Sequence, residues 1–518
     1  MEGSKMKKII AIAFAAIIAG LAISCQKEES VSDKTDAVQY TFNITVSNQA
    51  GFDNDASTKG GSFATYKTGW ENKDRIFLFF KPTDGSLLDD TYATLTYNGS
   101  SWDGTVTPGQ SSLGDGGTLS AVYVYKLDGS VTPAYSDNKW TIATGNTFYN
   151  CQTGVDYTVS DNVISASLNL VAPTDFVQFY VSGGATGALT CDKVKGWKDV
   201  AIGSDMSVSN AICTGYMEGF ANSGDQYVRE YYGRIVSGTS LNGVECNFSV
   251  VKDGKVYERT ATPTTDARSF KMMTTSWTEA YGKLPGLFTV GNGADGKAGT
   301  EDDVQVRFSK GNLWYGPATE GAPATFNFEA NQYSISSSWD ANHVSNFYWS
   351  KTASVAYADS YNESGTSEDD VFFTNATGFT VGGQTNVWRT LSHDEWKYLF
   401  DHHTYKYVSV NGKHGIVIAP DEFSGTIEDS YEGEAWATAE SNGFVFLPST
   451  GYRSGLGILE KEGDKISCIY WTSTASGLDD DNPTAYRTFF QWNKDTPLSK
   501  NFETGLREWA VGIRLVSD

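Results

Sequence analysis

Short runs in which apolar and polar residues alternate recur along this chain. Residues 39–46 (QYTFNITV) and 163–170 (VISASLNL) follow this pattern, and three largely apolar runs of strand length lie at 75–80, 121–125 and 176–181. Successive side chains of a strand point to opposite faces, so the alternation indicates strands with one buried face. Gly, Thr, Ser and Tyr are frequent around these runs, which suits strands joined by tight turns. The chain is therefore predicted to be mainly β.

Length and charge limit the organisation and the partners. A chain of 518 residues is too long for one ordinary domain and suggests two to four. With 62 acidic and 39 basic residues the formal net charge is −23, and such a surface repels a phosphate backbone. No nucleic-acid partner is therefore expected. Turn-forming residues at 282–286 and a glycine- and acid-rich stretch at 291–303 place the last domain boundary at about 284.

The first 24 residues combine a basic start with an apolar run. Three lysines fall within the first eight residues, and residues 9–23 are apolar or small, which is the length of a signal-peptide core. The run ends at Ser24-Cys25 and resembles a bacterial lipobox, although Ala22 stands where Leu is the usual residue. We expect 1–24 to be a signal peptide, Cys25 to be acylated and 25–36 to be a lipidated tether.

The residues after Cys25 are Gln26, Lys27, Glu28 and Glu29. They resemble the short Lys-acidic signal that directs lipoproteins of Bacteroides-type bacteria to the outer face of the outer membrane, and a solvated tether is the alternative. No second apolar run of membrane length follows in the sequence, so the lipid would be the membrane anchor. The expected location is the outer membrane, with the protein facing the cell exterior.

Three pieces of the N-terminal part resemble the fimbrillin-like family of Bacteroides-type surface proteins. They are the strand at 39–46, the segments 58–60 (TKG) and 68–76 (TGWENKDRI), and the strand pair across 163–181. The resemblance implies two β-sandwich-like domains, at 37–160 and 161–283, in a protein that acts as a pilus subunit or a surface adhesin. An unrelated β-sandwich is the alternative.

The C-terminal region reads as an α+β domain. Residues 388–400 predict a helix, because Ser392 and Glu395 form a capping box ahead of an apolar stripe. Five motifs resemble, in order, the Fibrobacter succinogenes major paralogous domain family: WRTLSHDEW, FLPSTGYRSG, YWTST, AYRTFF and GIRLV. Members of this family share the C-type-lectin-like fold with the formylglycine-generating enzymes. The resemblance therefore implies a C-type-lectin-like domain at 284–518.

In that fold the last β-hairpins present one exposed face, which corresponds here to residues 470–515. Aromatic side chains interleaved with short polar ones suit a recognition face. The candidate ligand-binding residues are Tyr486, Arg487, Gln491, Trp492, Asn493, Lys494, Asn501 and Glu503. For Tyr486 a place in the core is the favoured alternative, and for Trp492 core and recognition are equally balanced.

One acidic stretch could bind a metal. Asp295, Glu301, Asp302 and Asp303 offer hard oxygen ligands for calcium, but the residue order is not that of an EF-hand and an acidic linker is favoured. We expect no other cofactor. The five histidines are interpreted as surface or structural residues: His343, His393, His402, His403 and His414.

Five cysteines follow the acylation site. Cys191 with Cys213, or Cys213 with Cys246, could form a disulfide in an oxidising compartment, and the sequence does not choose between them. Formylglycine-generating enzymes use a pair of active-site cysteines, whereas 284–518 contains only Cys468. No enzymatic activity is therefore expected.

The expected function is that of a surface lipoprotein that binds a glycan or protein ligand through its C-terminal domain. The alternative is a structural role as the anchor or tip subunit of a fimbria, with other fimbrial subunits as partners. A formylglycine-generating type of enzyme is the least expected of the three.

Overall fold

The structure, a computed structural model, describes most of the chain from residue 39 onward. The described residues are 39–47, 69–107, 111–145, 147–222, 225–236, 238–300, 302–317, 320, 322–334, 340–362, 370, 372–373, 379–454, 457–459, 465–479, 482–493 and 496–518. The predicted signal peptide, the tether, Cys25 and the signal Gln26, Lys27, Glu28 and Glu29 all lie outside them, as do Glu301 and Lys494.

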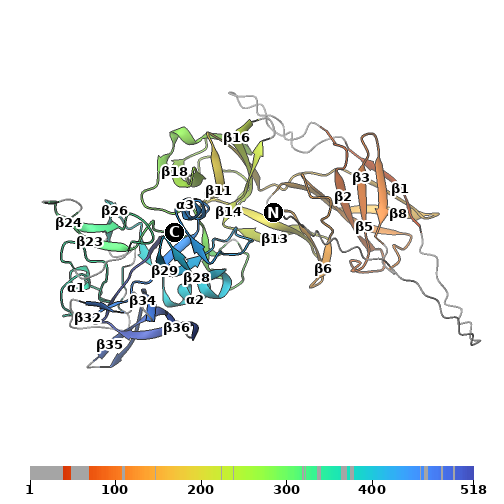
Figure 1. The fold of residues 1–518 in the computed structure, drawn as a ribbon. Coiled ribbons are helices and arrows are strands. Elements are labelled where there is room, and N and C mark those ends of the chain that lie inside the picture. The colour runs from red at the N-terminus through yellow and green to blue at the C-terminus, as the bar shows by residue number, and fades with distance from the viewer. Residues whose placement is uncertain are drawn as a thin grey trace, which may run out of the picture. The chain divides into compact units, whose positions relative to one another are not determined.

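The first sheet has seven strands. Its order is β1 (Thr41–Val46), β9 (Val163–Leu168), β8 (Tyr149–Ser160), β5 (Gly116–Val124), β2 (Arg75–Pro82), β3 (Tyr92–Tyr97) and β4 (Trp102–Val106). Neighbours run antiparallel except β1 and β9, which are parallel. The runs predicted as strands from their alternation or apolarity are all strands here, and the prediction of a mainly β chain is confirmed (Figure 1).

The second sheet has thirteen strands. Its main path is β19 (Ser269–Met273), β10 (Phe176–Ser182), β16 (Asp225–Ile235), β12 (Val194–Ile202), β11 (Ala185–Cys191), β17 (Cys246–Lys252), β18 (Lys255–Ala261) and β20 (Thr278–Glu279). Off this path lie β6 (Ala134–Ser136), β7 (Lys139–Ala143), β13 (Val208–Thr214), β14 (Tyr216–Met217) and β15 (Gly219–Asn222). The 3-10 helix η1 (Thr274–Ser276) precedes β20.

The two sheets do not separate at residue 160. Strand β9 follows that position but lies between β8 and β1 in the first sheet, while β7 precedes it and pairs with β12 in the second. One hydrophobic core contains side chains of both sheets, among them Phe79, Trp140, Trp197 and Tyr232. The predicted boundary between 37–160 and 161–283 therefore cuts through a sheet, because the sequence does not reveal which strands pair.

The C-terminal region is built from five small sheets. Two four-stranded sheets have the orders β21 (Phe288–Gly291), β22 (Val304–Phe308), β38 (Leu515–Ser517), β27 (Arg389–Thr390), and β23 (Leu313–Pro317), β24 (Ala324–Phe328), β25 (Thr380–Val381), β26 (Gln384–Thr385). A third four-stranded sheet has the order β30 (Ser430–Tyr431), β28 (Tyr405–Val410), β29 (Lys413–Ile418), β31 (Val445–Pro448). Two three-stranded sheets have the orders β33 (Gly457–Leu459), β32 (Tyr452–Ser454), β37 (Ala510–Val511), and β34 (Lys465–Asp479), β35 (Asn482–Asn493), β36 (Thr496–Leu506). The α-helices found among the described residues all lie here: α1 (Ala353–Ala356), α2 (His393–His402) and α3 (Glu434–Ser441).

Helix α2 begins directly after the capping box, at His393. The predicted span 388–400 starts too early, because Arg389 and Thr390 form strand β27. The Ser392 side chain accepts from the Glu395 backbone N–H (3.2 Å), and the Glu395 carboxylate accepts from the Ser392 N–H (2.7 Å). Trp396, Leu399 and Phe400 are buried on one side of the helix. A cap of this kind satisfies two backbone N–H groups that the first helical turn leaves unbonded.

No described pair of cysteines forms a disulfide. Cys191 and Cys246 share the core of the second sheet, and a hydrogen bond between the two thiols, together with burial, raises the pKa of Cys191. Cys213 lies elsewhere, 3.9 Å from the Arg234 guanidinium. The structure thus brings together a pair of cysteines that differs from both pairs considered from the sequence.

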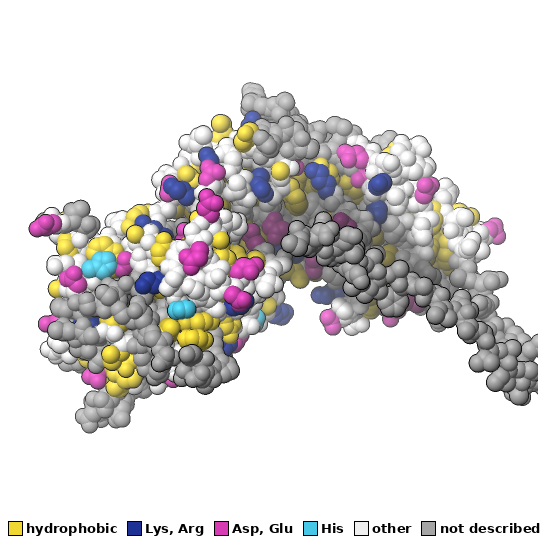
Figure 2. Space-filling model, in the orientation of Figure 1, with side chains coloured by type: hydrophobic (Ala, Val, Ile, Leu, Met, Phe, Trp, Pro, Cys, Tyr) yellow, Lys and Arg dark blue, Asp and Glu magenta, His cyan; other side chains and the backbone are white. Residues whose placement is uncertain are grey.

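Acidic and basic side chains are interspersed over the face shown in Figure 2. Across the described part of the chain, none of the helices reaches the length and apolarity needed to cross a bilayer.

Candidate functional site

The terminal sheet, β34–β35–β36, carries most of the predicted ligand-binding residues. The three strands lie side by side (Figure 1) and are antiparallel. Their register places Arg487 between Trp471 and Glu503. Tyr486, Arg487, Gln491 and Trp492 lie on β35, and Asn501 and Glu503 lie on β36. Asn493 ends β35 and is described by its backbone alone, and Lys494 lies outside the described residues.

These residues do not share a face. Because side chains alternate along a strand, Tyr486 and Trp492 point to one face of the sheet, while Arg487 and Gln491 point to the other. Asn501 and Glu503 pair across the sheet with Phe489 and Arg487, and so belong with the second group. The terminal sheet therefore offers two separate surfaces, each with part of the predicted set.

On the second face, Arg487 is held inside the protein. Only 5% of the residue is exposed, and its Nη2 donates to Glu503 Oε1 at 2.6 Å. The guanidinium carbon lies 4.7 Å from the Trp509 ring centroid and 5.3 Å from that of Phe489. Gly505 makes room for this arrangement, since a Cβ there would come within 2.9 Å of Arg487 Cδ. Arg487 thus ties β35 to β36 and to the segment that holds Trp509.

On the first face, the Tyr486 ring packs over helix α2. Its centroid lies 4.3 Å from that of His393, the first residue of the helix. The His393 Nδ1 is 3.0 Å from Asp394 Oδ1, and the Tyr486 side chain is half-buried. Tyr486 therefore joins the terminal sheet to α2.

Three aromatic rings meet at the other end of this face. The Trp492 ring centroid lies 5.6 Å from that of Tyr407 and 6.2 Å from that of His414, and the Tyr407 and His414 centroids are 5.9 Å apart. The three planes are nearly parallel, with angles of 8°, 10° and 2° between them. His414 is exposed, whereas Tyr407 and Trp492 are half-buried. We call these three residues the ring cluster.

The hairpin β28–β29 positions two members of the ring cluster. Tyr407 pairs with Ile416 and His414 pairs with Ser409, so the two rings are diagonal neighbours on one face of the hairpin. Burial raises the pKa of Tyr407 strongly, because its phenolic oxygen points inward. The rings therefore present an apolar surface at the rim of a core that also contains Ile416, Cys468 and Phe490.

Sequence reasoning identified Trp492 but not its two partners. Tyr407 lies in an unremarkable strand, and His414 was interpreted as a surface or structural residue. The alternation of 405–410 and 413–418 about the turn Asn411-Gly412 is the signal that could have placed Tyr407 and His414 on one face.

In the glycine- and acid-rich stretch 291–303, Asp302 and Asp303 accept hydrogen bonds from backbone N–H groups of the same stretch. Asp302 Oδ2 accepts from the N–H groups of Ala294 (2.6 Å) and Asp295 (3.0 Å), and Asp303 Oδ2 accepts from that of Gly299 (2.8 Å). Hydrogen bonds from Thr300 and from these backbone groups lower the pKa of Asp302. Within the described part of the chain, no three His, Cys, Asp or Glu side chains are grouped so that they could hold a metal ion.

Cys468 lies on β34 of the terminal sheet, and its side chain is buried. The residue is 1% exposed, its sulfur lies 3.2 Å from Ser449 Oγ, and burial raises its pKa to about 12. A thiol with so high a pKa is protonated at neutral pH and is a poor nucleophile.

Comparison with known proteins gives distant similarities. No family model matches the chain, and no curated protein matches it. Among solved structures, a provisionally assigned cell adhesion protein from Bacteroides fragilis is 12% identical, with 46% of this chain and 92% of that chain covered and a TM-score of 0.25. A fimbrial protein from Bacteroides ovatus is 13% identical, with 93% of this chain and 99% of that chain covered and a TM-score of 0.22.

The fimbrial anchor protein Mfa2 from Porphyromonas gingivalis is 9% identical, with 48% of this chain and 96% of that chain covered and a TM-score of 0.25. Similarities of this size do not place the chain in a family.

Proposed function

We propose that this chain is an exported surface lipoprotein that binds a glycan or protein ligand through the ring cluster of its C-terminal region. The observation that carries the proposal is the nearly parallel arrangement of Tyr407, His414 and Trp492 at the rim of the terminal sheet. Aromatic rings combine a large apolar surface with polar edges and lose little conformational freedom on binding, which makes them frequent anchors in recognition surfaces.

The location rests on the N-terminal sequence. The basic start, the apolar run and Ser24-Cys25 support export and acylation, and Gln26, Lys27, Glu28 and Glu29 support transfer to the cell exterior. An acylated Cys25 would hold the protein at the outer membrane through buried methylene groups. The folded part would then be free to meet ligands outside the cell.

Binding can be tested with the exported chain carrying Cys25→Ser, which cannot be acylated. Trp492→Ala should lower the affinity for glycan-array or cell-surface ligands about tenfold or more, as expected for a buried aromatic anchor. Tyr227→Ala is a matched control, because Tyr227 is 63% exposed on β16 of the second sheet. Equal affinity of the Trp492→Ala and Tyr227→Ala variants, both folded, would exclude the ring cluster as the binding surface.

The location has its own test. Protease added to intact cells should degrade the native protein, and Cys25→Ser should release it from the membrane fraction. A protein that stays whole on intact cells does not face the exterior.

A structural role in a fimbria is the second candidate, because the seven-stranded sheet ends in the strands β1 and β4, which have one strand neighbour each within the described sheet. Edge strands can accept a strand from another chain. Co-purification with polymerised fimbrial subunits, together with unchanged ligand binding in Trp492→Ala, would favour this role.

A further inference from the structure

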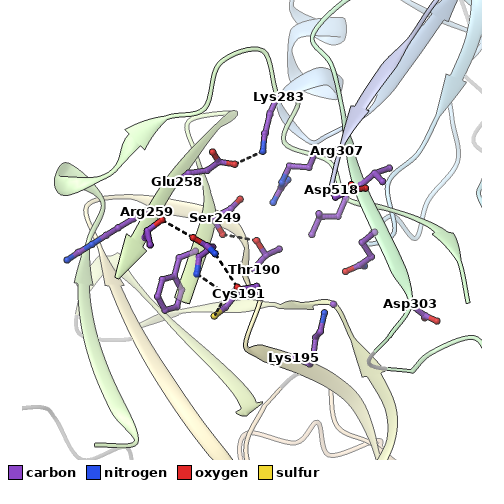
Figure 3. A pocket seen from close by; sticks show the side chains of 18 residues that line it. Thr190, Cys191, Lys195, Ser249, Glu258, Arg259, Lys283, Asp303, Arg307 and Asp518 are labelled. Atoms are coloured by element: carbon purple, nitrogen blue, oxygen red, sulfur yellow. Dashed lines mark hydrogen bonds and ion pairs between the residues drawn. The ribbon is translucent and has the colours of Figure 1, made fainter. Parts of the chain in front are cut away.

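A pocket of about 500 Å³ lies between the second sheet and the C-terminal region. Residues of β11, β17 and β18 line one side, and residues around β22 together with Asp518 line the other (Figure 3). The volume is within the range of pockets that hold small ligands. None of the ring cluster lines this pocket, so the inference below does not rest on the function proposed for the terminal sheet.

Arg307 reaches this pocket from strand β22. Its neighbours Val306 and Phe308 belong to a hydrophobic core of the C-terminal region, so the alternation of the strand directs Arg307 to the opposite side. The residue is 4% exposed. Its Nη1 donates to the Pro285 carbonyl, while its Nη2 is buried and has no hydrogen-bond partner within the described part of the chain.

The carboxylates around the pocket do not neutralise Arg307. Three of the four that line it are paired with other cations: Glu258 with Lys283 (2.6 Å), Asp192 with Lys193 (2.8 Å) and Asp518 with Arg389 (2.7 Å). The fourth, Asp303, accepts from the Gly299 N–H, and burial raises its pKa. No described carboxylate lies within ion-pair distance of the Arg307 guanidinium, although the charges of Glu422 and Glu258 act on it from farther away.

A second cation faces the same space. Lys195 lies on β12, is half-buried, and forms no ion pair with any described residue. Figure 3 shows Lys195 entering the pocket from the second sheet while Arg307 enters it from the C-terminal region. Of the four cations that line the pocket, Lys283 pairs with Glu258 and Arg259 donates to Ser276 Oγ, which leaves Lys195 and Arg307 to approach the space from different elements.

A buried cation without a counterion is unfavourable. Burial lowers the pKa of Arg307 to about 10, so the side chain stays protonated at neutral pH. Removing a charge from water costs several kcal/mol unless an opposite charge and hydrogen bonds compensate. A planar guanidinium with a free N–H matches the geometry of an oxyanion.

We propose that this pocket binds a small ligand through an oxyanion group, a carboxylate, sulfate or phosphate, which pairs with Arg307 and Lys195. The buried Nη2 of Arg307 donates to one oxygen of the group, and Lys195 neutralises its charge from the opposite wall.

The test uses the exported chain with Cys25→Ser in titration calorimetry with glucuronate, sulfate, phosphate and chloride at constant ionic strength. We expect saturable binding of at least one of the three oxyanions. Comparison of their affinities identifies whether the pocket prefers a carboxylate, a sulfate or a phosphate. Lys195→Met should weaken that binding about tenfold or more. Lys193→Met is the matched control, because Lys193 lies in the same hairpin but pairs with Asp192 and does not line the pocket.

Arg307→Met gives an independent readout. It should abolish the oxyanion-induced rise in Tm, whatever the Tm of the variant without ligand, since the group that pairs with the oxyanion is removed. Should this variant not fold, the lysine pair decides. The inference is overturned if no oxyanion binds saturably, if chloride binds equally well, or if Lys195→Met and Lys193→Met bind alike.

Discussion

Residues 40–283 and 284–518 bury charge in different ways. Among the described residues, Glu230 is the buried charged residue of the first region, whereas the second buries Arg307, Glu329, Arg453, Arg487, Arg507 and Arg514. Most strands of the first region have five residues or more and bond to one another through the backbone, for example over the eight residues of β2, and in the C-terminal region the terminal sheet β34–β35–β36 does the same. Many strands of the C-terminal region have two to five residues, so backbone ladders join fewer of its segments.

Buried side chains make these connections instead. Arg507 donates to Asp370 Oδ2 (3.0 Å) and to the Thr484 carbonyl (3.0 Å), and its guanidinium lies 4.2 Å from the Trp349 ring centroid. One side chain thus links segments that are far apart in the sequence. The comparison indicates that an irregular chain path can be fixed by directional polar contacts, provided that the groups are satisfied.

The largest expected effect concerns two buried glutamines, one in each region. Gln332 accepts from Arg514 Nη2 (2.6 Å) and the Phe446 N–H (2.8 Å), and donates to Glu440 (2.9 Å) and the Phe444 carbonyl (3.2 Å). Gln332→Leu leaves these groups without partners and should lower the free energy of unfolding by about 3 kcal/mol or more in urea.

Gln178 of the second sheet is the matched control. It is also 0% exposed, but its Oε1 accepts from Ser269 Oγ (3.0 Å), while its amide nitrogen has no partner among the residues that the structure describes. Gln178→Leu should therefore cost about 1 kcal/mol or less. Equal losses in the two variants would contradict the contrast between the regions.

A smaller effect is expected at the cap of α2. Ser392→Ala removes the hydrogen bond to the Glu395 N–H and should cost about 1 kcal/mol. Thr352, the N-cap of α1, makes no side-chain cap hydrogen bond, so Thr352→Ala should change stability little. Chemical denaturation of both variants compares them, and a larger loss at Thr352 would disprove the role assigned to the capping box.

The smallest effect is a pH dependence confined to the C-terminal region, which holds all five histidines. The His343 Nε2 lies 2.7 Å from Glu329 Oε1, and this hydrogen bond raises the pKa of His343 above its ordinary value. Its contribution to stability is therefore complete below a pH of about 6.5 and is lost as the pH rises through the pKa of the folded state.

The difference in Tm between the wild type and His343→Gln should shrink over that pH range, and NMR titration of the His343 ring should give a raised pKa. A His343 that titrates at its ordinary pKa would exclude this pH dependence.

The sequence predicts local features better than pairings. The capping box at Ser392 and the alternation in 39–46 depend on residues near one another, and both appear as expected. A local hairpin joins β9 to β8, but its pairing with Thr41–Val46, more than a hundred residues away, is encoded by no local pattern. The faces of the terminal sheet follow from a local pattern, because alternation along β35 separates Tyr486 and Trp492 from Arg487 and Gln491.

The parallel pairing of β1 with β9 has a mechanical consequence. Six residue pairs, from Thr41↔Val163 to Val46↔Leu168, join the first described strand to the rest of the sheet. A pull along the strand axis on the chain ahead of Thr41 is shared by all six pairs at once, whereas a pull across the axis would open them one after another. A tether attached at that end can therefore sustain tension best when drag on the protein aligns it with β1.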